Sequence, residues 1–537
     1  MTSKRRLWGA VAGLAAAGTA ALAVTPALAT THATTTSHRT VVVRRAAGGL
    51  AGSQPGWQGA GQNNGDTHNN PDEHIIGVNN VSKLAPKWTF TTAGDISATA
   101  TVAAGRVFVP DWGGKLWALS AATGKAIWSD TITSYDGIPG DVSRTSPAYY
   151  RGEIVIGTGA QTISTMDGSY VVGINAQTGK MLWRTEVSSD RAAVITSSPT
   201  VDNGVVYVAP SSKDEYLSTA PTFRGSIMAL SARTGKILWK TYIVPPGYTG
   251  GAVWGSQPVA DHQTGMVYIG TGNNYSVPSG VCANPGQTGC TPPSAANHVD
   301  SILGLSLKTG QIEWSHPTLT ADTWTVYEPG SSPDFDFGAG PNLYTTVING
   351  KPAQLLGIGQ KSGVYYALNP ATGKTVWQTQ AGPGGALGGI EWGTATNGQQ
   401  VFVAEANSGH KKYTITSYDG KKSATTGGLF AALNAATGKI EWQVADPEGK
   451  YLDDSFVSSA NGVMYAGSAA ATGKNMYAFD ARTGKLRWSY ASGGAEFAGA
   501  SIAGGTVYWG SGYHTESLGL GYPGDNDKLY AFTLGGN

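Results

Sequence analysis

The chain has 537 residues, and its 36 Lys and Arg nearly balance its 35 Asp and Glu, which gives a formal net charge of +1. This balance, with no basic patch along the sequence, gives no electrostatic reason to expect nucleic acid as a partner. Charged residues make up only 13% of the chain, whereas glycine, tryptophan and tyrosine are abundant. A typical globular protein has about 25% charged residues. The composition therefore predicts a turn-rich β protein.

The first 29 residues are predicted to be an export signal peptide. A basic start is followed by an apolar run, Leu7 to Val24, and by a small-residue cleavage site, Ala27 to Ala29; the basic residues are Lys4, Arg5 and Arg6. The apolar run is long enough to cross a bilayer, so an uncleaved membrane anchor is the alternative. Export by the Sec or the twin-arginine route stays open. We expect a secreted mature chain with no stable membrane insertion.

Residues 30–56 are rich in Thr, Ala and Ser and are predicted to form a flexible linker. Residues 57–537 are predicted to form a single domain, because one sequence unit recurs along most of their length. The unit is Ala118 to Trp128, an apolar strand-like run, a Thr-Gly turn and a tryptophan four residues after the glycine. Glycine suits a turn with positive φ, and tryptophan adds a large apolar body. Further copies are Gly173 to Trp183, Ala229 to Trp239, Gly304 to Trp314, Ala367 to Trp377, Ala432 to Trp442 and Ala478 to Trp488.

The two ends of this region each carry part of a repeat. Val81 to Phe90 resembles a repeat's tail and includes Trp88, whereas Lys528 to Thr533 resembles a beginning that never reaches its Thr-Gly. Pairing these segments in one sheet would close a ring and leave no unpaired edge, as in propellers. With Trp88, the repeat tryptophans number eight.

Each repeat also contains a second strand-like run, such as Arg106 to Val109 or Val205 to Val208, with a short strand upstream. No long stretch has the 3.6-residue period of a helix. The sequence therefore predicts an all-β fold: an eight-bladed β-propeller of four-stranded antiparallel blades, closed by its N- and C-terminal strands. A solenoid is the alternative, and the split terminal repeat disfavours it.

The Thr-Gly-x-x-x-Trp repeats resemble the tryptophan-docking motifs of the quinoprotein alcohol dehydrogenases, eight-bladed propellers that bind pyrroloquinoline quinone. The likeness covers nearly all of the predicted mature chain. It is more specific for fold than for catalysis, because non-enzymatic propellers of the same superfamily carry similar repeats. Function must therefore be sought where the copies differ.

Blade four shows the clearest departure, Gly251-Ala-Val-Trp254 followed by Gly270-Thr-Gly-Asn273 and a long insertion. The resemblance implies that Trp254 lies beneath the flat cofactor and that Asn273 gives its side-chain oxygen to calcium. An aromatic face suits an extended aromatic ligand, and calcium prefers oxygen ligands. A docking tryptophan and a turn asparagine are the alternative.

Three further segments match the family pattern. In the polar loop from Ser211 to Tyr216, the resemblance implies that Ser212 bonds the quinone and that Glu215 is a calcium ligand, with Asp214 as a competing candidate and a surface loop as the alternative. At two innermost strands, Arg144 and Thr196 fall where relatives contact the cofactor carboxylates, a task that suits the planar fork of arginine.

The segment Ser332 to Gly338 resembles the family's Asp-x-Trp-Asp stretch, although Phe335 replaces the tryptophan. The resemblance makes Asp336 the catalytic base and places it beside calcium, where it could take the hydroxyl proton while hydride leaves the alcohol carbon. Lys361 matches the residue that bonds the reactive quinone oxygens, as an electrophile and cofactor ligand. Trp392, after Glu391, matches a cofactor-contacting position more loosely.

Cys282 and Cys290 are the only cysteines, and they lie eight residues apart in a Pro/Gly-rich segment. In an exported protein this spacing predicts a local disulfide rather than a metal site. The adjacent Cys-Cys pair that covers the quinone in many relatives is absent, as is the Cys-x-x-Cys-His of c-type haem. Both features fit the polyvinyl alcohol dehydrogenase branch without its cytochrome part.

The sequence thus predicts a secreted alcohol dehydrogenase that depends on pyrroloquinoline quinone and calcium and passes electrons to an external acceptor. Its substrate would be a small or polymeric alcohol. A non-catalytic secreted propeller that acts as a binding or assembly scaffold is the first alternative. A polysaccharide-acting enzyme with Asp334 and Asp336 as paired acids is the second.

Overall fold

The computed structural model describes residues 56–159, 167–255, 257–470, 472–513 and 526–537. The predicted signal peptide, residues 1–29, and all of the predicted linker except residue 56 lie outside this range and stay predictions. Ser53–Asn537 forms one compact unit, and the fold described below belongs to it. Within the described ranges, no helix combines the length and apolar character needed to cross a membrane.

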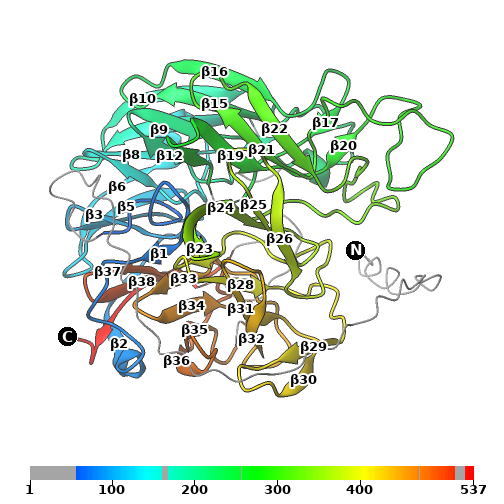
Figure 1. Ribbon diagram of the computed structural model, residues 1–537. Helices are drawn as coiled ribbons and strands as arrows, with labels where there is room; N and C mark the ends of the chain where they lie inside the picture. Colours follow the sequence, from blue (N-terminus) through cyan, green and yellow to red (C-terminus); the bar gives the residue numbers. More distant parts are fainter. Residues whose placement is uncertain (1–55, 160–166, 256, 471, 514–525) are drawn as a thin grey trace, which may run out of the picture. The chain divides into compact units, whose positions relative to one another are not determined.

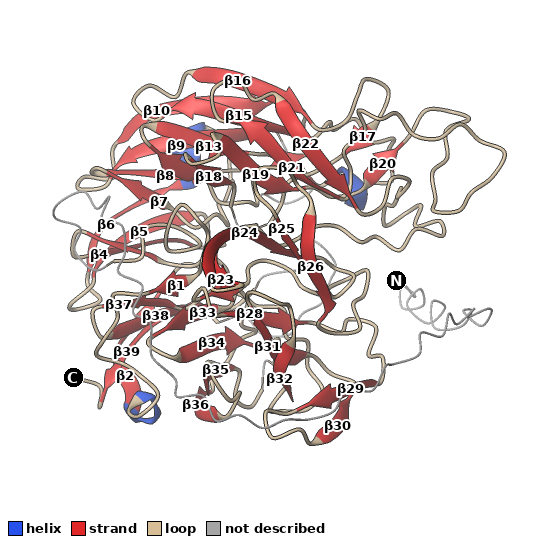
Figure 2. Cartoon of the chain, viewed as in Figure 1, coloured by secondary structure: helices blue, strands red, loops and turns tan. Residues whose placement is uncertain are grey.

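Eight four-stranded antiparallel sheets, with very little helix, make up the described part of this unit (Figures 1 and 2). From inner to outer strand, the blades are as follows. Blade one is β3 (Thr101–Ala103), β4 (Arg106–Pro110), β5 (Lys115–Ser120) and β6 (Ala126–Thr131), and blade two is β7 (Ala148–Tyr150), β8 (Glu153–Gly157), β9 (Ser169–Asn175) and β10 (Met181–Ser188). Blade three is β12 (Thr200–Asp202), β13 (Val205–Val208), β15 (Ser226–Ser231) and β16 (Ile237–Tyr242), and blade four is β18 (Val259–Asp261), β19 (Met266–Gly270), β21 (Ser301–Ser306) and β22 (Ile312–Pro317).

Blade five is β23 (Asn342–Ile348), β24 (Lys351–Gly359), β25 (Val364–Leu368) and β26 (Thr375–Gln380), and blade six is β27 (Ala395–Thr396), β28 (Gln400–Glu405), β31 (Leu429–Asn434) and β32 (Ile440–Ala445). Blade seven is β33 (Ser458–Ala460), β34 (Val463–Gly467), β35 (Met476–Asp480) and β36 (Leu486–Tyr490), and blade eight is β37 (Ser501–Ala503), β38 (Thr506–Ser511), β39 (Lys528–Leu534) and β2 (Leu84–Thr91). Outside the blades lie β1 (Asn69–Asn70), β11 (Ala193–Val194), β14 (Ser211–Ser212), β17 (Thr249–Gly250), β20 (Asn274–Ser276), β29 (Tyr413–Thr416), β30 (Lys422–Thr425), the helix α1 (Ile132–Asp136) and the 3-10 turns Val81–Lys83 and Asp214–Tyr216.

The ring is closed by strands from the two ends of the unit. β2 pairs in antiparallel register with β39, and Trp88 lies opposite Ala531. The N-terminal strand, blue in Figure 1, accordingly lies beside the red C-terminal strands. The eight-bladed propeller and its closure are therefore confirmed, and the solenoid alternative is wrong.

Each repeat tryptophan fastens its blade to the next one. Its indole N–H donates to a main-chain carbonyl of the following blade at 2.6–3.2 Å; the pairs are Trp88 and Ala121, Trp128 and Ala176, Trp183 and Ala232, Trp239 and Leu307, Trp314 and Pro370, Trp377 and Ala435, Trp442 and Ala481, and Trp488 and Leu84. For seven of the eight tryptophans the ring also lies against the glycine of the Thr-Gly turn in that blade; the exception is Trp488, because blade eight has no such turn. At Gly310, φ is +73° and an added Cβ would lie 2.4 Å from Cε3 of Trp239. This glycine is thus required both by its backbone conformation and by the tryptophan of the preceding blade.

The hydrophobic core lies mainly between neighbouring blades. One cluster joins Phe402, Phe430 and Trp442 of blade six to Met464 and Tyr477 of blade seven, all buried. The inner strands carry alternating apolar side chains for these contacts, as expected for sheets packed face to face.

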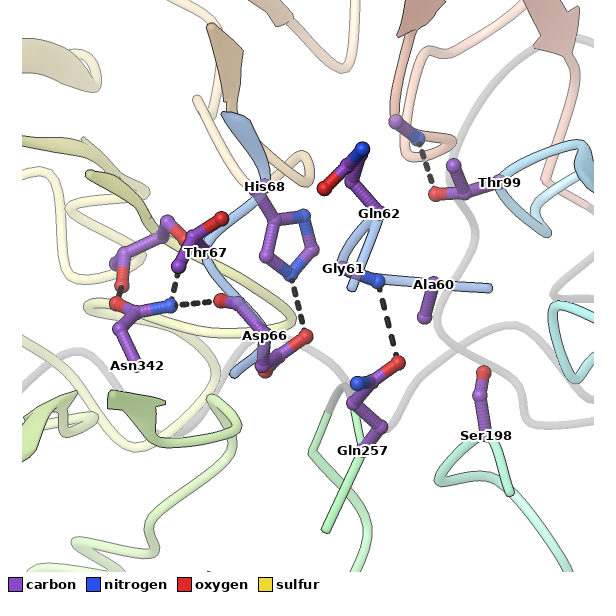
Figure 3. Close-up of polar contacts among 12 residues, drawn as sticks. Ala60, Gly61, Gln62, Asp66, Thr67, His68, Thr99, Ser198, Gln257 and Asn342 are labelled. Carbon is purple, nitrogen blue, oxygen red and sulfur yellow. Dashed lines mark hydrogen bonds and ion pairs between the residues drawn. The ribbon is translucent and has the colours of Figure 1, made fainter. Parts of the chain in front are cut away.

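Residues 57–70, which we call the N-terminal clasp, hydrogen-bond to all eight blades. β1 of the clasp pairs in parallel with β33 of blade seven. Figure 3 shows Gly61 N–H against Gln257 of blade four, Asn342 of blade five against the Asp66 carbonyl, and His68 against the Asp66 carboxylate. The other contacts are Trp57 with Val102, Gln58 O with Tyr149 N, Asn64 with Asp202, Gly65 O with Leu343 N, Thr67 O with Thr396 N, His68 O with Ser459 N, and Asn70 with Ile502 O.

Candidate active site

A cavity of about 130 Å³ lies where the chain enters the innermost strands of the blades. Residues just before these strands line it in seven consecutive blades: Arg144, Thr196, Trp254, Asp336, Trp392, Asp454 and Phe497. The clasp, by contrast, bonds mostly to residues within these strands, a few positions further along the chain than the cavity residues of the same blades. Cavity and clasp therefore contact successive levels of the innermost strands.

The cavity collects most of the residues that the sequence singled out. These are Arg144, Thr196, Ser212, Glu215, Trp254, Asp336, Lys361 and Trp392. Asn273 is not part of the lining, but it contacts Asp336 directly. Its backbone N–H donates to Asp336 Oδ1 at 2.8 Å.

Asp336 is held by three neighbouring groups in the cavity wall. Besides the Asn273 N–H, the indole N–H of Trp254 donates to Asp336 Oδ2 at 2.9 Å, and the Lys361 ammonium lies 3.5 Å from the same oxygen. Lys361 also lies 5.2 Å from the centre of the Trp254 ring. Gly338 packs against that ring, where an added Cβ would lie 2.3 Å from Cη2. The wall thus fixes the orientation of both the carboxylate and the indole.

Lys361 and Asp334 form an ion pair beside this arrangement. Lys361 Nζ lies 3.1 Å from Asp334 Oδ2. Burial acts to lower the pKa of Lys361, but the carboxylates of Asp334 and Asp336 outweigh it and hold that pKa well above its usual value. Asp334 is buried and lies outside the cavity lining, so Asp336 is the member of this acid pair that faces the cavity.

Two neighbouring acids in the turn Asp214–Tyr216 face in different directions. Asp214 Oδ2 accepts the backbone N–H groups of Thr222 and Phe223 at 2.7 and 2.8 Å, so this carboxylate faces the protein. Glu215 lines the cavity instead, and burial raises its pKa to about 7. Ser212 Oγ accepts the Asp214 N–H at 3.0 Å and supports the loop. Of the two competing acids, only Glu215 faces the cavity.

Aromatic rings and an arginine form the neighbouring part of the wall. The Arg144 guanidinium lies 4.2 Å from the centre of the Trp392 ring and donates to the Tyr513 hydroxyl at 3.1 Å. Trp392 meets Trp254 edge-on, with ring centres 5.4 Å apart, and has a positive φ of 56°. A non-glycine residue with this φ is a source of strain that tends to mark functional sites. Thr196 contacts the Trp254 carbonyl through its hydroxyl at 3.5 Å.

The match to known proteins covers most of the propeller. A family model described as the glucose/ethanol/alcohol dehydrogenase β-propeller domain matches residues 57–390, more than half of the chain. The chain belongs to the quinoprotein alcohol dehydrogenase family. A second model, for the outer membrane protein assembly factor BamB, matches residues 360–520.

Relatives and solved structures agree with this membership. The polyvinylalcohol dehydrogenase of a Sphingopyxis species is 31% identical over 549 residues, covering 91% of this chain and 77% of the relative. A protein of the same name from a Pseudomonas species is 28% identical and covers 90% of this chain and 77% of its own length. A quinohemoprotein alcohol dehydrogenase structure from Pseudomonas putida, at 20% identity, has a TM-score of 0.70 over 90% of this chain and 81% of that chain, which shows a shared fold. The predicted family is confirmed, and the chain is an enzyme of the alcohol dehydrogenase class.

The cavity of this family member has the chemistry that a flat quinone with carboxylates requires. Trp254, Trp392, Phe497 and Tyr513 supply aromatic surface, and Arg144, Lys213 and Lys361 supply positive charge. The two further acids, Glu391 and Asp454, are buried, and burial raises the pKa of Asp454 to about 7 and that of Glu391 well above its usual value. Burial thus disfavours the charged forms of Glu391 and Asp454, and a lower negative charge in the wall favours an anionic ligand.

Oxygen donors for a hard cation also lie at this cavity. Glu215 and Asp336 both line it, and both amide protons of Asn273 are taken, by the carbonyls of Asn274 and Trp324 at 2.8 and 2.9 Å. This orientation leaves the Asn273 side-chain oxygen as an acceptor. In the described ranges, no group of three or more His, Cys, Asp and Glu forms a metal site. Two carboxylates and an amide oxygen nevertheless suit calcium in chemistry.

The insertion in blade four carries the predicted disulfide. Cys282 and Cys290 are bonded, with Cα atoms 5.1 Å apart. The Thr323 N–H donates to the Ala283 carbonyl at 3.0 Å, next to Trp324, whose carbonyl holds Asn273. The disulfide loop is thus linked through one short segment to the wall of the cavity.

Several residues of the lining were not predicted from the sequence. They are Trp112, Lys213, Tyr216, Asp454, Phe497 and Tyr513. A positional signal was present for two of them, because Asp454 and Phe497 lie four residues before the innermost strands of their blades, as Arg144 and Thr196 do. Tyr513 and Trp112 instead follow the second strands of their blades, β38 and β4, and matched no family pattern in the sequence.

Proposed function

We propose that the chain is an exported dehydrogenase that uses pyrroloquinoline quinone and calcium to oxidise hydroxyl groups of a long or polymeric aliphatic alcohol, with an external electron acceptor. The polyvinylalcohol dehydrogenases among its relatives support this substrate class. Exposed apolar residues near the cavity, which we call the apolar rim, support it too. Leu387 lines the cavity and is 48% exposed, and Val326 and Tyr327, outside the lining, are 47% and 60% exposed. Val326 N–H donates to the Glu215 carbonyl at 2.9 Å, which keeps this rim next to the cavity.

The observation that carries the proposed mechanism is the position of Asp336 in the cavity wall. In this proposal its carboxylate takes the proton from the substrate hydroxyl, a role that requires a fixed acceptor within hydrogen-bond reach. The N–H groups of Trp254 and Asn273 hold that carboxylate, and Lys361 stabilises its negative charge. Pyrroloquinoline quinone, when bound, supplies the acceptor for the hydride of the alcohol carbon.

In this proposal, the other residues bind and orient the quinone and the calcium ion. We assign Trp254 to the face of the quinone and Trp392 to the wall beside Trp254. Arg144, Thr196 and Ser212 would bind the polar edge of the quinone, and Lys361 its reactive oxygens. Glu215, Asp336 and the Asn273 side-chain oxygen would hold calcium. A fixed set of this kind lowers the barrier by orientation and by electrostatics.

The test is the replacement Asp336→Asn, which keeps the shape and one of the two N–H contacts, since Trp254 and Asn273 donate to different oxygens, and removes the base. We expect turnover of an alcohol with an artificial dye acceptor to fall by about 10²- to 10⁴-fold. Quinone binding should remain measurable. The matched variant Asp334→Asn, two residues away and outside the lining, should keep more activity. An Asp336→Asn enzyme with full turnover would rule out this base.

A further inference from the structure

Lys213 is a buried cation without a partner in the wall of the cavity. It is 5% exposed, and its Nζ has no hydrogen-bond or ion-pair partner in the described part of the chain. Its backbone N–H donates to the Ala192 carbonyl at 2.9 Å, so the residue is anchored between β14 and the Glu215 turn. An ammonium group buried without a partner is costly, and proteins seldom keep one without a use.

The surroundings of Lys213 increase this cost. Arg144 lies in the same cavity wall, and its positive charge acts against that of Lys213. The acid whose charge acts on Lys213 is Asp141, whose oxygens already accept the N–H groups of Val142 and Gly159 at 2.8 and 3.0 Å. Burial and Asp136 raise the pKa of Asp141 to about 8, so this acid is largely neutral near pH 7. Two cations thus share one region of the wall without a full counter-charge.

We propose that Lys213 binds a carboxylate of the quinone together with Arg144, an inference that rests on the function proposed above. Arg144 is stacked on Trp392 and bonded to Tyr513, which fixes its fork in place. Lys213 is a flexible point charge and adds a donor beside it. An anion between them satisfies both groups, and charge-assisted hydrogen bonds of this kind are the strong ones.

The experiment is a titration of the purified, metal-loaded protein with pyrroloquinoline quinone, followed by tryptophan fluorescence, for the wild type, Lys213→Met and Lys213→Arg. We expect Lys213→Met to weaken quinone binding by about 10- to 100-fold, the effect of losing one hydrogen bond to a charged group. Lys213→Arg should stay within a few-fold of the wild type. Lys240→Met is the matched control, because Lys240 lies in the same blade but outside the cavity, with its Nζ on the Val187 carbonyl at 3.1 Å.

A second readout uses the protein without quinone. Because Lys213→Met replaces an unpaired buried charge by an apolar chain of similar length, its melting temperature should equal or exceed that of the wild type. Lys213→Gln gives the same comparison if the Met variant fails to fold. Wild-type quinone affinity in both neutral variants would overturn the role of Lys213 and leave the proposed function standing. A wild-type protein that binds no quinone would overturn both.

Discussion

In each of two pairs of acids that are close in sequence, one carboxylate faces the cavity and the other faces the protein. This difference decides which carboxylates are available to a ligand. Asp334 pairs with Lys361 behind the wall, whereas Asp336 faces the cavity. Asp214 accepts two backbone N–H groups, whereas Glu215 faces the cavity. Two backbone N–H groups at Asp214 and the Lys361 ion pair at Asp334 therefore hold one acid of each pair in the protein and leave the other to face the cavity.

The second of these pairs gives a prediction about calcium. Glu215→Gln removes one negative charge from the proposed ligand set and should raise the calcium concentration needed for half-maximal quinone binding by about tenfold or more. Asp214→Asn is the control, because an amide oxygen can still accept both backbone N–H groups. Isothermal titration with calcium in the presence of quinone measures both. Equal calcium affinities in the two variants would remove Glu215 from the ligand set.

At the scale of the elements, the blade is defined by a contact between consecutive repeats. The tryptophan of one blade donates to a carbonyl of the next and covers the glycine of its Thr-Gly turn. The Thr-Gly-x-x-x-Trp spacing within one repeat therefore reflects a contact between two neighbouring repeats. This is why the fold could be predicted from sequence: a short local motif carries long-range information.

This contact predicts unequal effects for two glycines with the same backbone conformation. Gly310 and Gly265 have φ of +73° and +74°, but an added Cβ would meet Trp239 at 2.4 Å in the first and nothing within 4 Å in the second. Gly265→Ala should cost only the strain of the positive φ, roughly 1–2 kcal/mol. Gly310→Ala should cost about 1–3 kcal/mol more because the tryptophan must move.

The measurement is the free energy of unfolding of the two alanine variants and the wild type in denaturant. A Gly310→Ala variant no less stable than Gly265→Ala would show that the tryptophan contact is easily rearranged. The docking interpretation of the repeat would then be wrong.

The parts of the site that sequence could not reveal depend on contacts between distant segments. Arg144, Trp254 and Asp336 were found because they sit at one position of the repeat and match a family pattern. Lys213 and Tyr513 have no such signal, since their place in the wall depends on loops that differ from blade to blade. The clasp is similar, because its Asn70 bonds to Ile502, 432 residues further on.

For the whole propeller, the clasp adds a second closure besides the pairing of β2 with β39. It hydrogen-bonds to every blade along the innermost strands, and its Trp57 is fully buried. His68 stacks on Phe456, with ring centres 5.8 Å apart, and Phe456 packs in turn against Trp392 of the cavity. The clasp thus supports the ring and one wall of the site.

Removal of the clasp should accordingly destabilise the ring. A chain that starts at residue 71 should have a free energy of unfolding lower by roughly 5 kcal/mol or more, at about 1 kcal/mol for each net hydrogen bond lost. A chain that starts at Ser53, the first residue of the compact unit, should match the full-length protein. Thermal and denaturant unfolding measure both chains. Equal stability of the two shortened chains would show that the ring closes without the clasp.

The central claim is that this cavity binds quinone and uses it to oxidise alcohols. The most direct measurement is a titration of the purified protein with pyrroloquinoline quinone and calcium, followed by addition of an alcohol, such as short oligomers of vinyl alcohol, while the absorbance of the bound quinone is recorded. We predict one quinone bound per chain and its reduction by the alcohol in the wild type, with binding but no reduction in Asp336→Asn. Absence of binding at micromolar quinone, or bound quinone that no alcohol reduces, would contradict the claim.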